Sequence, residues 1–196
     1  MPVTRLVRWV QNFTSRHGET TLVGRQDGLG GRAADGSSFA AHLPFGGAYD
    51  GPADLDSFAE ACAPPVDWGI LLVRKGGFAV ARLHGEATVD SKTGQRHVQG
   101  RTKAGGQSQQ RFARRRDNQA RQAYEAASEH AARILAGARI VVVGGDHVAV
   151  EAVLSDRRLA DLVVVPPFLA VPDPRRAVLV QAVLDAGSVR VEVTNA

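Results

Sequence analysis

One stretch of the sequence gathers residue types suited to chemistry on a polyanionic target. Segment 100–116 contains the triplet Gly105, Gly106 and Gln107, and an arginine-rich stretch follows it directly. Its basic residues are Arg101, Lys103, Arg111, Arg114, Arg115 and Arg116, and it has no acidic residue. Glycines give a loop conformational freedom and hold no side chain between backbone and target. Because arginine offers several donors to phosphate, the segment predicts a loop that approaches the end of an RNA.

The chemistry available to Gln107 is limited and specific. Glutamine has no titratable group, so it cannot act as a general acid or base, but it offers two N–H donors and a carbonyl acceptor. Such a group suits positioning a water molecule and stabilising a developing oxyanion or leaving alkoxide. A partner must then supply most of the catalytic site. Gln109 and Gln110 are nearby alternatives, and Gln107 is preferred because it alone follows the paired glycines.

A long helix is predicted directly after this loop, over residues 109–136. The residues of its apolar stripe are Phe112, Ala120, Ala123, Tyr124, Ala127, Ala131, Ile134 and Leu135. Most of the arginines fall on the other side and near the start, and Gly137 ends the pattern. The helix is therefore expected to dock at its C-terminal end and to project at its basic N-terminal end.

The elements around the loop predict an α/β (α+β) fold with a mixed sheet. An antiparallel meander precedes the loop, with strands expected at 68–73 and 78–83 and a hairpin of strands 86–90 and 95–98 around residues 91–94. A βαβαβ alternation follows the long helix, with strands at 139–143, 162–165 and 188–193 and helices at 148–154 and 174–186. We therefore assign residues 67–196 to one domain that carries the Gly-Gly-Gln loop.

Residues 1–66 are expected to form a small N-terminal α+β segment. A helix is predicted over residues 4–17, with Thr4 as its cap and Gly18 at its end. Strands are predicted at 20–23 and 38–43, and a short helix at 54–63. The intervening stretch 24–36 is rich in turn dipeptides, so Gly28-Leu29-Gly30-Gly31 is interpreted as hairpin turns and not as a phosphate loop.

The extended motif resembles one protein family. Gly105-Gly106-Gln107-Ser108, two further residues and Arg111-Phe112-Ala113-Arg114 are similar to the central domain of eukaryotic and archaeal class I translation release factors. The motif covers residues 100–116, and the order of elements extends the likeness to 68–193. The resemblance implies a release-factor central-domain fold, which is RNase H-like. It also implies hydrolysis of the ester between nascent peptide and tRNA in the peptidyl transferase centre. Gly105, Gly106 and Gln107 match the family's catalytic triplet, in which the glutamine coordinates the attacking water or the leaving ribose hydroxyl.

Residues 1–66 look too short for a codon-reading domain, and no length remains after residue 193 for a partner-binding domain. The chain therefore looks like the release domain alone, of the type of the actinobacterial Vms-like release factors of ribosome quality control. The implied function is codon-independent peptidyl-tRNA hydrolysis that releases nascent chains from stalled or split large ribosomal subunits. Its implied partners are ribosomal RNA of the large subunit and peptidyl-tRNA. We expect a monomer with no cofactor and no contact with DNA or membranes.

Two other functions remain open from the residues. A non-catalytic ribosome- or RNA-binding surveillance factor needs the arginines but not Gln107. A nuclease acting on the tRNA acceptor end is disfavoured, because no carboxylate cluster for metal ions lies near the loop.

Composition agrees with a cytoplasmic protein that binds an anionic partner. The 196 residues carry a formal net charge of +4, and only Lys75, Lys92 and Lys103 among the 24 basic residues are lysine. The lone cysteine, Cys62, excludes an intrachain disulfide and a multi-cysteine zinc site, and is expected to be a buried thiol. Neither a secretory signal nor a membrane-spanning run is apparent.

The remaining candidate sites have simpler interpretations. Gly144-Gly145-Asp146-His147 follows a strand, and is interpreted as a tight turn in which Asp146 caps the next helix. His147 and Glu151 stand one helical turn apart, and two ligands do not make a metal site. The isolated histidines His84, His97 and His130 are expected at the surface or hydrogen bonded, so no metal site is predicted.

Overall fold

A computed structural model of residues 1–196 describes the backbone of residues 1–95 and 107–196, and the side chains of residues 1–95 and 121–196. Predictions for Arg101, Lys103, Gly105, Gly106 and the strand end at 97–98 lie outside the described residues. The chain is α+β and forms two compact units. Unit 1 consists of Met1–Pro65, Val165–Pro167 and Val183–Ala196, and unit 2 of Val66–Val164 and Phe168–Ala182.

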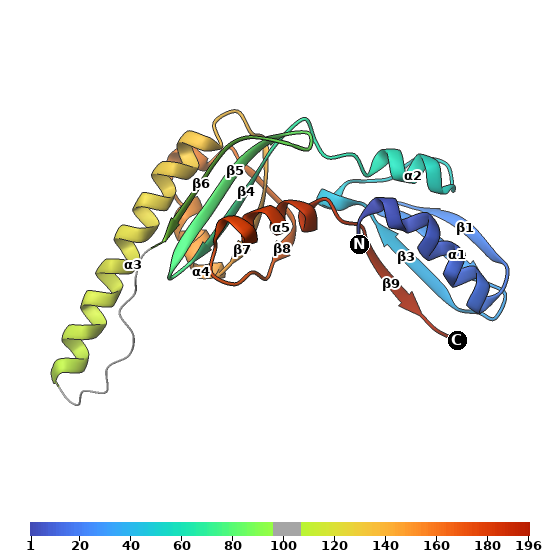
Figure 1. The fold of residues 1–196 in the computed structure, drawn as a ribbon, viewed down its shortest axis with the longest axis horizontal. Coiled ribbons are helices and arrows are strands. Elements are labelled where there is room, and N and C mark those ends of the chain that lie inside the picture. The colour runs from blue at the N-terminus through green and yellow to red at the C-terminus, as the bar shows by residue number, and fades with distance from the viewer. Residues whose placement is uncertain (96–106) are drawn as a thin grey trace. The chain divides into compact units, whose positions relative to one another are not determined.

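Unit 1 is a four-stranded antiparallel sheet in the order β1-β2-β3-β9, with helices packed on one face (Figure 1). Its elements are η1 Val3–Arg5, α1 Leu6–His17, β1 Thr20–Arg25, β2 Gly28–Ala33, β3 Ser38–His42, η2 Pro44–Gly46, α2 Leu55–Ala61 and β9 Arg190–Thr194. Leu6, Val10 and Phe13 recur at helical spacing on α1 and are buried against the sheet. Gly18 ends α1 as predicted, with a φ of 90°.

The predicted cap of the first helix is wrong. Thr4 lies inside the 3-10 turn η1, and Arg5 occupies the position before α1 without a side-chain capping bond. The N-terminal amino group instead donates to the Val189 carbonyl at 2.8 Å, and the Val189 N–H donates to the Met1 carbonyl at 2.9 Å. Backbone pairing with the C-terminal part of unit 1 therefore fixes the chain's start.

The glycine-rich stretch after β1 is a buried strand, not the series of turns predicted for it. Only the turn at Asp27-Gly28 and the turn at Asp35-Gly36 remain, whereas Gly30 and Gly31 lie inside β2. A Cβ on Gly31 would overlap the ring of Phe39, which packs under α1 between Trp9 and Phe13. The glycines therefore serve close packing of an aromatic ring across the strand pair.

The last strand differs from the predicted βαβαβ alternation. Strand β9 pairs antiparallel with β3 in the sheet of unit 1, with Val193 opposite Phe39. The alternating pattern of β9 is compatible with either sheet, because alternation predicts a strand but does not identify the strand with which it pairs. Residues 183–196 accordingly group with the first 65 residues.

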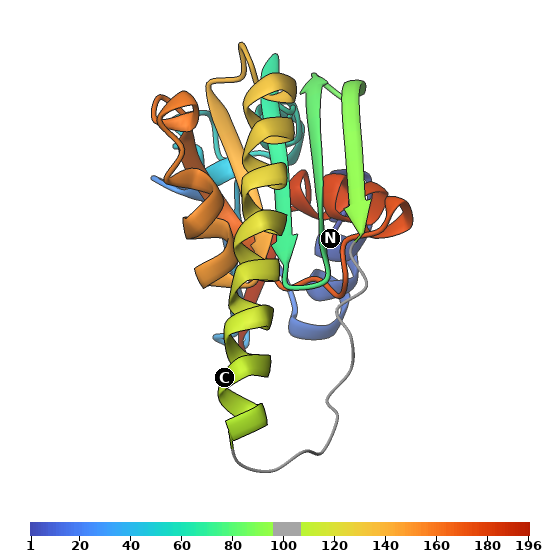
Figure 2. The same ribbon diagram turned by 90° about the vertical axis from the view of Figure 1, so that its left-hand side faces the viewer.

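Unit 2 contains a five-stranded mixed sheet in the order β6-β5-β4-β7-β8 (Figure 2). Its elements are β4 Asp67–Arg74, β5 Gly77–His84, β6 Ala87–Gln95, α3 Gln107–Ile134, β7 Ile140–Gly145, α4 His147–Leu154, η3 Arg157–Leu159, β8 Val163–Leu169 and α5 Arg176–Ala186, the last crossing into unit 1. Strands β4, β5 and β6 form the predicted antiparallel meander, and β4 pairs parallel with β7. The central strand β4 is buried on both faces, since α3 and α4 cover one and α5 lies over the other.

The second predicted hairpin is absent from the meander. Residues 87–95 form one strand, β6, and Lys92 and Gly94 pair with Val80 and Phe78 of β5. A Cβ on Gly94 would overlap the ring of Phe78, so this glycine admits a cross-strand aromatic ring and does not form a turn. Strand β6 therefore continues to Gln95, with one irregularity in its pairing with β5 at Arg82 and Leu83.

Gly31→Ala tests the packing role of the glycine strand. The added methyl group must displace the Phe39 ring, so we expect a loss of about 1–3 kcal/mol in the free energy of unfolding. Urea denaturation measures it. Gly24→Ala in β1 is the matched control, because the nearest atom to its Cβ, the Gly51 carbonyl oxygen, lies 3.8 Å away. Equal stability of the two variants would contradict this account.

Candidate functional site

Helix α3 is held to unit 2 by its C-terminal half. Ala127, Ala131, Ile134 and Leu135 are buried in one core with side chains of β4, β5, β7 and α4. Leu135 lies directly over Gly69 of β4, where a Cβ would overlap its methyl group. The small alanines let the helix approach the sheet closely, and this close packing fixes the helix axis.

Polar contacts reinforce the same half of α3. The Ser128 hydroxyl lies 3.3 Å from the Val153 carbonyl of α4, and Arg133 forms a 2.8 Å ion pair with Asp90 of β6. The Arg82 guanidinium donates to the carbonyl of Ala136, just beyond the helix end. These contacts fix α3 to both neighbours of its docking face, and the exposed ion pair adds little energy by itself.

The N-terminal half of α3 extends away from the sheet (Figures 1 and 2). Gln107 is the first residue of the helix, and Ala127 is its first buried residue among those whose side chains are described. The helical rise places these two positions about 30 Å apart. The predicted docking of one end and projection of the other is confirmed for the helix backbone.

The predicted site residues divide between the helix and the segment outside the described residues. Gln107 opens α3, and Arg111, Arg114, Arg115 and Arg116 lie in its first three turns. Gln109 and Gln110 lie in the same first turn of the helix as Gln107. The roles of all these residues stay predictions, as do those of the residues in 96–106.

The projecting half of α3 leaves the sheet at one particular edge. Val163 N–H donates to the Arg139 carbonyl, and a Cβ on Gly144 would overlap Leu169, so β8 runs in the same direction as β7. The carboxyl ends of β4, β6, β7 and β8 therefore meet at one edge, here called the carboxyl edge. Tyr124 of α3 packs against the unit 2 core, and burial raises the pKa of its hydroxyl, with the Asp146 carboxylate adding to the rise. Beyond this point α3 extends past the end of β4 at the carboxyl edge (Figure 2). Open α/β sheets bind ligands at such edges.

The structural roles predicted for Asp146, Cys62, His84 and His130 are confirmed. Asp146 caps α4 by accepting from the Val148 and Ala149 N–H groups at 3.1 and 3.4 Å. Cys62 is buried, and desolvation raises the pKa of its thiol to about 11, which makes it a poor nucleophile. His84 lies 3.5 Å from Asp67, and His130 stacks on Phe78.

No group of three or more His, Cys, Asp or Glu residues suited to a metal ion occurs among the described residues. The prediction that the protein needs no metal or cofactor stays a prediction. In the same part of the chain, no helix is long and apolar enough to cross a membrane.

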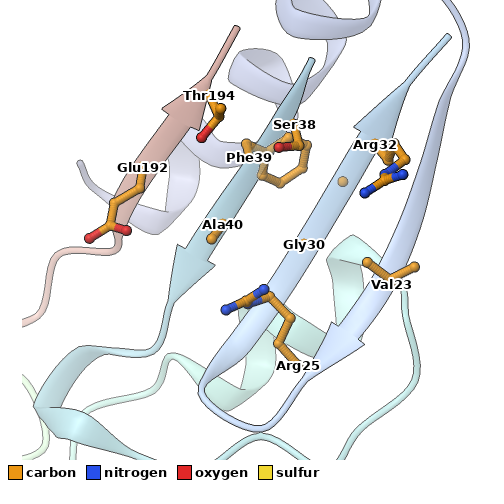
Figure 3. Close-up of a pocket in the computed structure, with 10 residues that line it drawn as sticks. Val23, Arg25, Gly30, Arg32, Ser38, Phe39, Ala40, Glu192 and Thr194 are labelled. Carbon is orange, nitrogen blue, oxygen red and sulfur yellow. The ribbon is translucent and has the colours of Figure 1, made fainter. Parts of the chain in front are cut away.

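A groove of about 270 Å³ lies on the face of the unit 1 sheet opposite α1 (Figure 3). Gly30 and Ala40 form its floor, and the side chains of Arg25 and Arg32 stand on either side of Gly30. Arg25 pairs with Asp27 at 3.3 Å, and Glu192 pairs with Arg190 at 3.5 Å. Because its charges are largely paired, the groove favours neither an anion nor a cation.

The net positive charge belongs to unit 2. Unit 1 holds six of the 24 basic residues and nine of the 20 acidic ones, so it is net acidic. Unit 2 is therefore net basic, and it contains α3 and the segment before it. An anionic partner is attracted to the unit that carries the Gly-Gly-Gln triplet.

Comparison with known families agrees with this arrangement. Residues 66–192 match the model of a family described as Actinobacteria/chloroflexi VLRF1 release factor. The chain belongs to this family. The match begins at the first residue of unit 2 and spans the sheet, α3 and the elements after it, so family membership supports a release-factor function and interaction with the ribosome. A search of curated proteins found no match.

The sequence did not single out Arg74 and Phe168, which lie at the carboxyl edge with His147. The predicted strand ended at residue 165, before the Pro166-Pro167 pair, whereas β8 continues to Leu169. Two prolines indicate a strand end, but β8 has an edge position in which missing N–H groups are tolerated. The signal available in the sequence was a large apolar residue, Phe168, directly after the two prolines, which is compatible with a continued strand.

Ala131→Leu tests the anchor of α3. Ala131 is completely buried, so the larger side chain must push the helix away from the sheet, and we expect a loss of about 1–3 kcal/mol in the free energy of unfolding. Denaturant unfolding measures it. The control is Ala126→Leu on the exposed side of the same helix, for which we expect less than about 0.5 kcal/mol. An equal loss in both variants would argue against a close-packed anchor.

Proposed function

We propose that this protein is a codon-independent peptidyl-tRNA hydrolase that releases nascent chains from stalled or split large ribosomal subunits. Its membership of a release-factor family supports a release function. The observation that carries the proposal is the position of Gln107, the last residue of the Gly-Gly-Gln triplet, as the first residue of a helix that extends about 30 Å beyond its buried anchor. This arrangement suits delivery of a small amide group into a narrow RNA cavity.

In the proposed reaction, water attacks the carbonyl carbon of the ester between the peptide and the tRNA ribose. The carbon–oxygen bond to the ribose breaks, the peptide leaves with a carboxyl group, and the ribose oxygen takes a proton. Gln107 cannot accept that proton, because its amide does not titrate. Its part is to hold the water or to donate an N–H to the leaving oxygen, while RNA of the peptidyl transferase centre completes the site. Gly105 and Gly106 allow the backbone to approach without side-chain obstruction.

The basic residues provide the proposed contacts with the phosphates of ribosomal RNA and tRNA. They are Arg101, Lys103, Arg111, Arg114, Arg115 and Arg116. Arg111, Arg114 and Arg115 stand at helical positions i, i+3 and i+4, which is the spacing of neighbours along a helix. The protein acts as a cytoplasmic monomer without a cofactor in this proposal, and the subunit supplies the remainder of the active site.

Gln107→Ala tests the catalytic proposal. On large subunits that carry peptidyl-tRNA, this variant is expected to bind normally and to release peptide about 100-fold more slowly, because a transition-state donor is lost. Single-turnover peptide release measures the rate, and subunit co-sedimentation measures the binding. Gln109→Ala and Gln110→Ala are matched controls and are expected to keep nearly full activity.

The outcomes of this assay separate the alternative functions. Wild-type release by the Gln107→Ala variant would remove Gln107 from the mechanism. Subunit binding without release by the wild-type protein would favour a non-catalytic surveillance factor. A shortened tRNA 3′ end after the reaction would indicate a nuclease, whereas the proposal expects an intact tRNA.

Arg114→Gln and Arg115→Gln test the phosphate contacts. Each is expected to weaken binding to the large subunit and to reduce the slope of log affinity against log salt by about one, because one counterion fewer is released. Arg133→Gln is the control in the same helix, since Arg133 is held by Asp90 near the docked end. An unchanged slope in the first two variants would contradict phosphate contact by these residues.

A further inference from the structure

His147 and Phe168 form an exposed aromatic pair at the carboxyl edge of the unit 2 sheet. Their ring centroids lie 3.7 Å apart, and their planes differ by 11°. His147 is the first residue of α4, and Phe168 lies near the end of β8 with 36% of its surface exposed. Stacked rings at the surface are a preferred support for an unpaired nucleic-acid base, because every base has a π-face.

Arg74 provides a cation at the same edge, in contact with the segment next to each ring. Its side-chain stem packs so closely on Gly145 that a Cβ on this glycine would lie 3.0 Å from Arg74 Cγ. Gly145 is two residues before His147. Its Nη1 donates to the Val171 carbonyl at 2.7 Å, and Val171 is three residues after Phe168. Arg74 therefore lies between the two segments that supply the rings.

The guanidinium of Arg74 has N–H donors in addition to the one that binds Val171. Arginine carries five N–H groups, and one is used by Val171. Arg74 is exposed and takes part in none of the ion pairs found among the described residues. The nearby Asp146 carboxylate is engaged by the backbone N–H groups of Val148 and Ala149. The remaining N–H groups of Arg74 suit a phosphate, which accepts several hydrogen bonds from one guanidinium.

We propose that the carboxyl edge of the unit 2 sheet binds one unpaired nucleotide of a single-stranded RNA, with its base stacked on the His147–Phe168 pair and its phosphate on Arg74. The net basic charge of unit 2 favours an anionic partner over an apolar or basic one. The stacked rings favour a nucleic acid over an acidic protein, because a base has a π-face and a carboxylate has none. The projecting half of α3 leaves from the same edge, so RNA bound along the helix passes close to this site. The site concerns binding alone and is independent of any action of Gln107 on the ester.

The test compares two single-stranded ligands by fluorescence anisotropy. One is a fluorescein-labelled oligoadenylate, and the other is an abasic oligomer with the same number of phosphates. Phe168→Leu keeps the apolar volume and removes the ring, and His147→Ala removes the other ring. Each is expected to weaken binding of the oligoadenylate about 5- to 50-fold and to leave the abasic oligomer unchanged, because base stacking is lost and phosphate contact is kept.

Arg74→Gln is expected to weaken binding of both oligomers and to reduce the slope of log affinity against log salt concentration by about one. Val148→Ala is the control for a general surface effect, since Val148 is 71% exposed and is not part of the stack. Phe168→Tyr keeps a ring and is expected to bind both ligands as the wild-type protein does. Thermal unfolding of every variant separates loss of binding from loss of fold.

Two results would overturn the proposal. Equal weakening of the oligoadenylate and the abasic oligomer by Phe168→Leu would show that the ring does not stack on a base. Unchanged binding of both ligands, together with weaker association with the large subunit, would assign the pair to a protein contact. The Gln107→Ala variant is expected to bind both RNAs normally, so failure of this site is distinguishable from failure of the catalytic proposal.

Discussion

The close packing of α3's small-residue face against the unit 2 sheet is the interaction on which the rest depends. Ala127 and Ala131 bring the helix near the strands, and Leu135 fills the space that Gly69 leaves open. Only the C-terminal half of the helix is held in this way. A helix fixed at one end is stiff over a few turns, so its packing sets the direction in which Gln107 lies.

This constraint separates what the protein contributes from what its partner contributes. Within the described residues of unit 2, the buried Ser128 hydroxyl bonds to backbone carbonyls, and the partly exposed Asp146 carboxylate caps α4. Both side chains therefore serve the fold. Cys62 of unit 1 is buried with a raised pKa and is chemically inert. In the proposed function, this scaffold brings the non-titrating amide of Gln107 to RNA, and the net basic charge of unit 2 attracts that RNA.

Sequence periodicity predicted most of the elements, because their burial follows from local spacing. The stripe that ends in Ile134 and Leu135 gave the docked half of α3, and the apolar runs gave β4, β5 and β7. The errors share a cause, which is that long-range partners decided the outcome. Gly30, Gly31 and Gly94 suggested turns, but they lie in strands because Phe39 and Phe78 occupy the space above Gly31 and Gly94.

The pairing partners of strands and the neighbours of side chains could not be predicted from the sequence, because both depend on long-range contacts. Strand β9 alternates correctly for a strand, yet nothing local says that β3 is its neighbour. The His147–Phe168 stack joins residues from two elements, and Arg74 comes from a third. The Gly-Gly-Gln triplet could be singled out in the sequence because its residues are contiguous. His147, Phe168 and Arg74 could not, because only the fold brings them to one edge.

The central claim is that α3 acts as a spacer of fixed length between its buried anchor and Gln107. It is tested most directly by inserting seven helix-forming residues after Arg121, which lengthens the helix by about 10 Å and nearly preserves its rotational phase. The measurement is single-turnover peptide release on large subunits, with unfolding stability recorded alongside. The account predicts wild-type stability and loss of release, and release at the wild-type rate would contradict it.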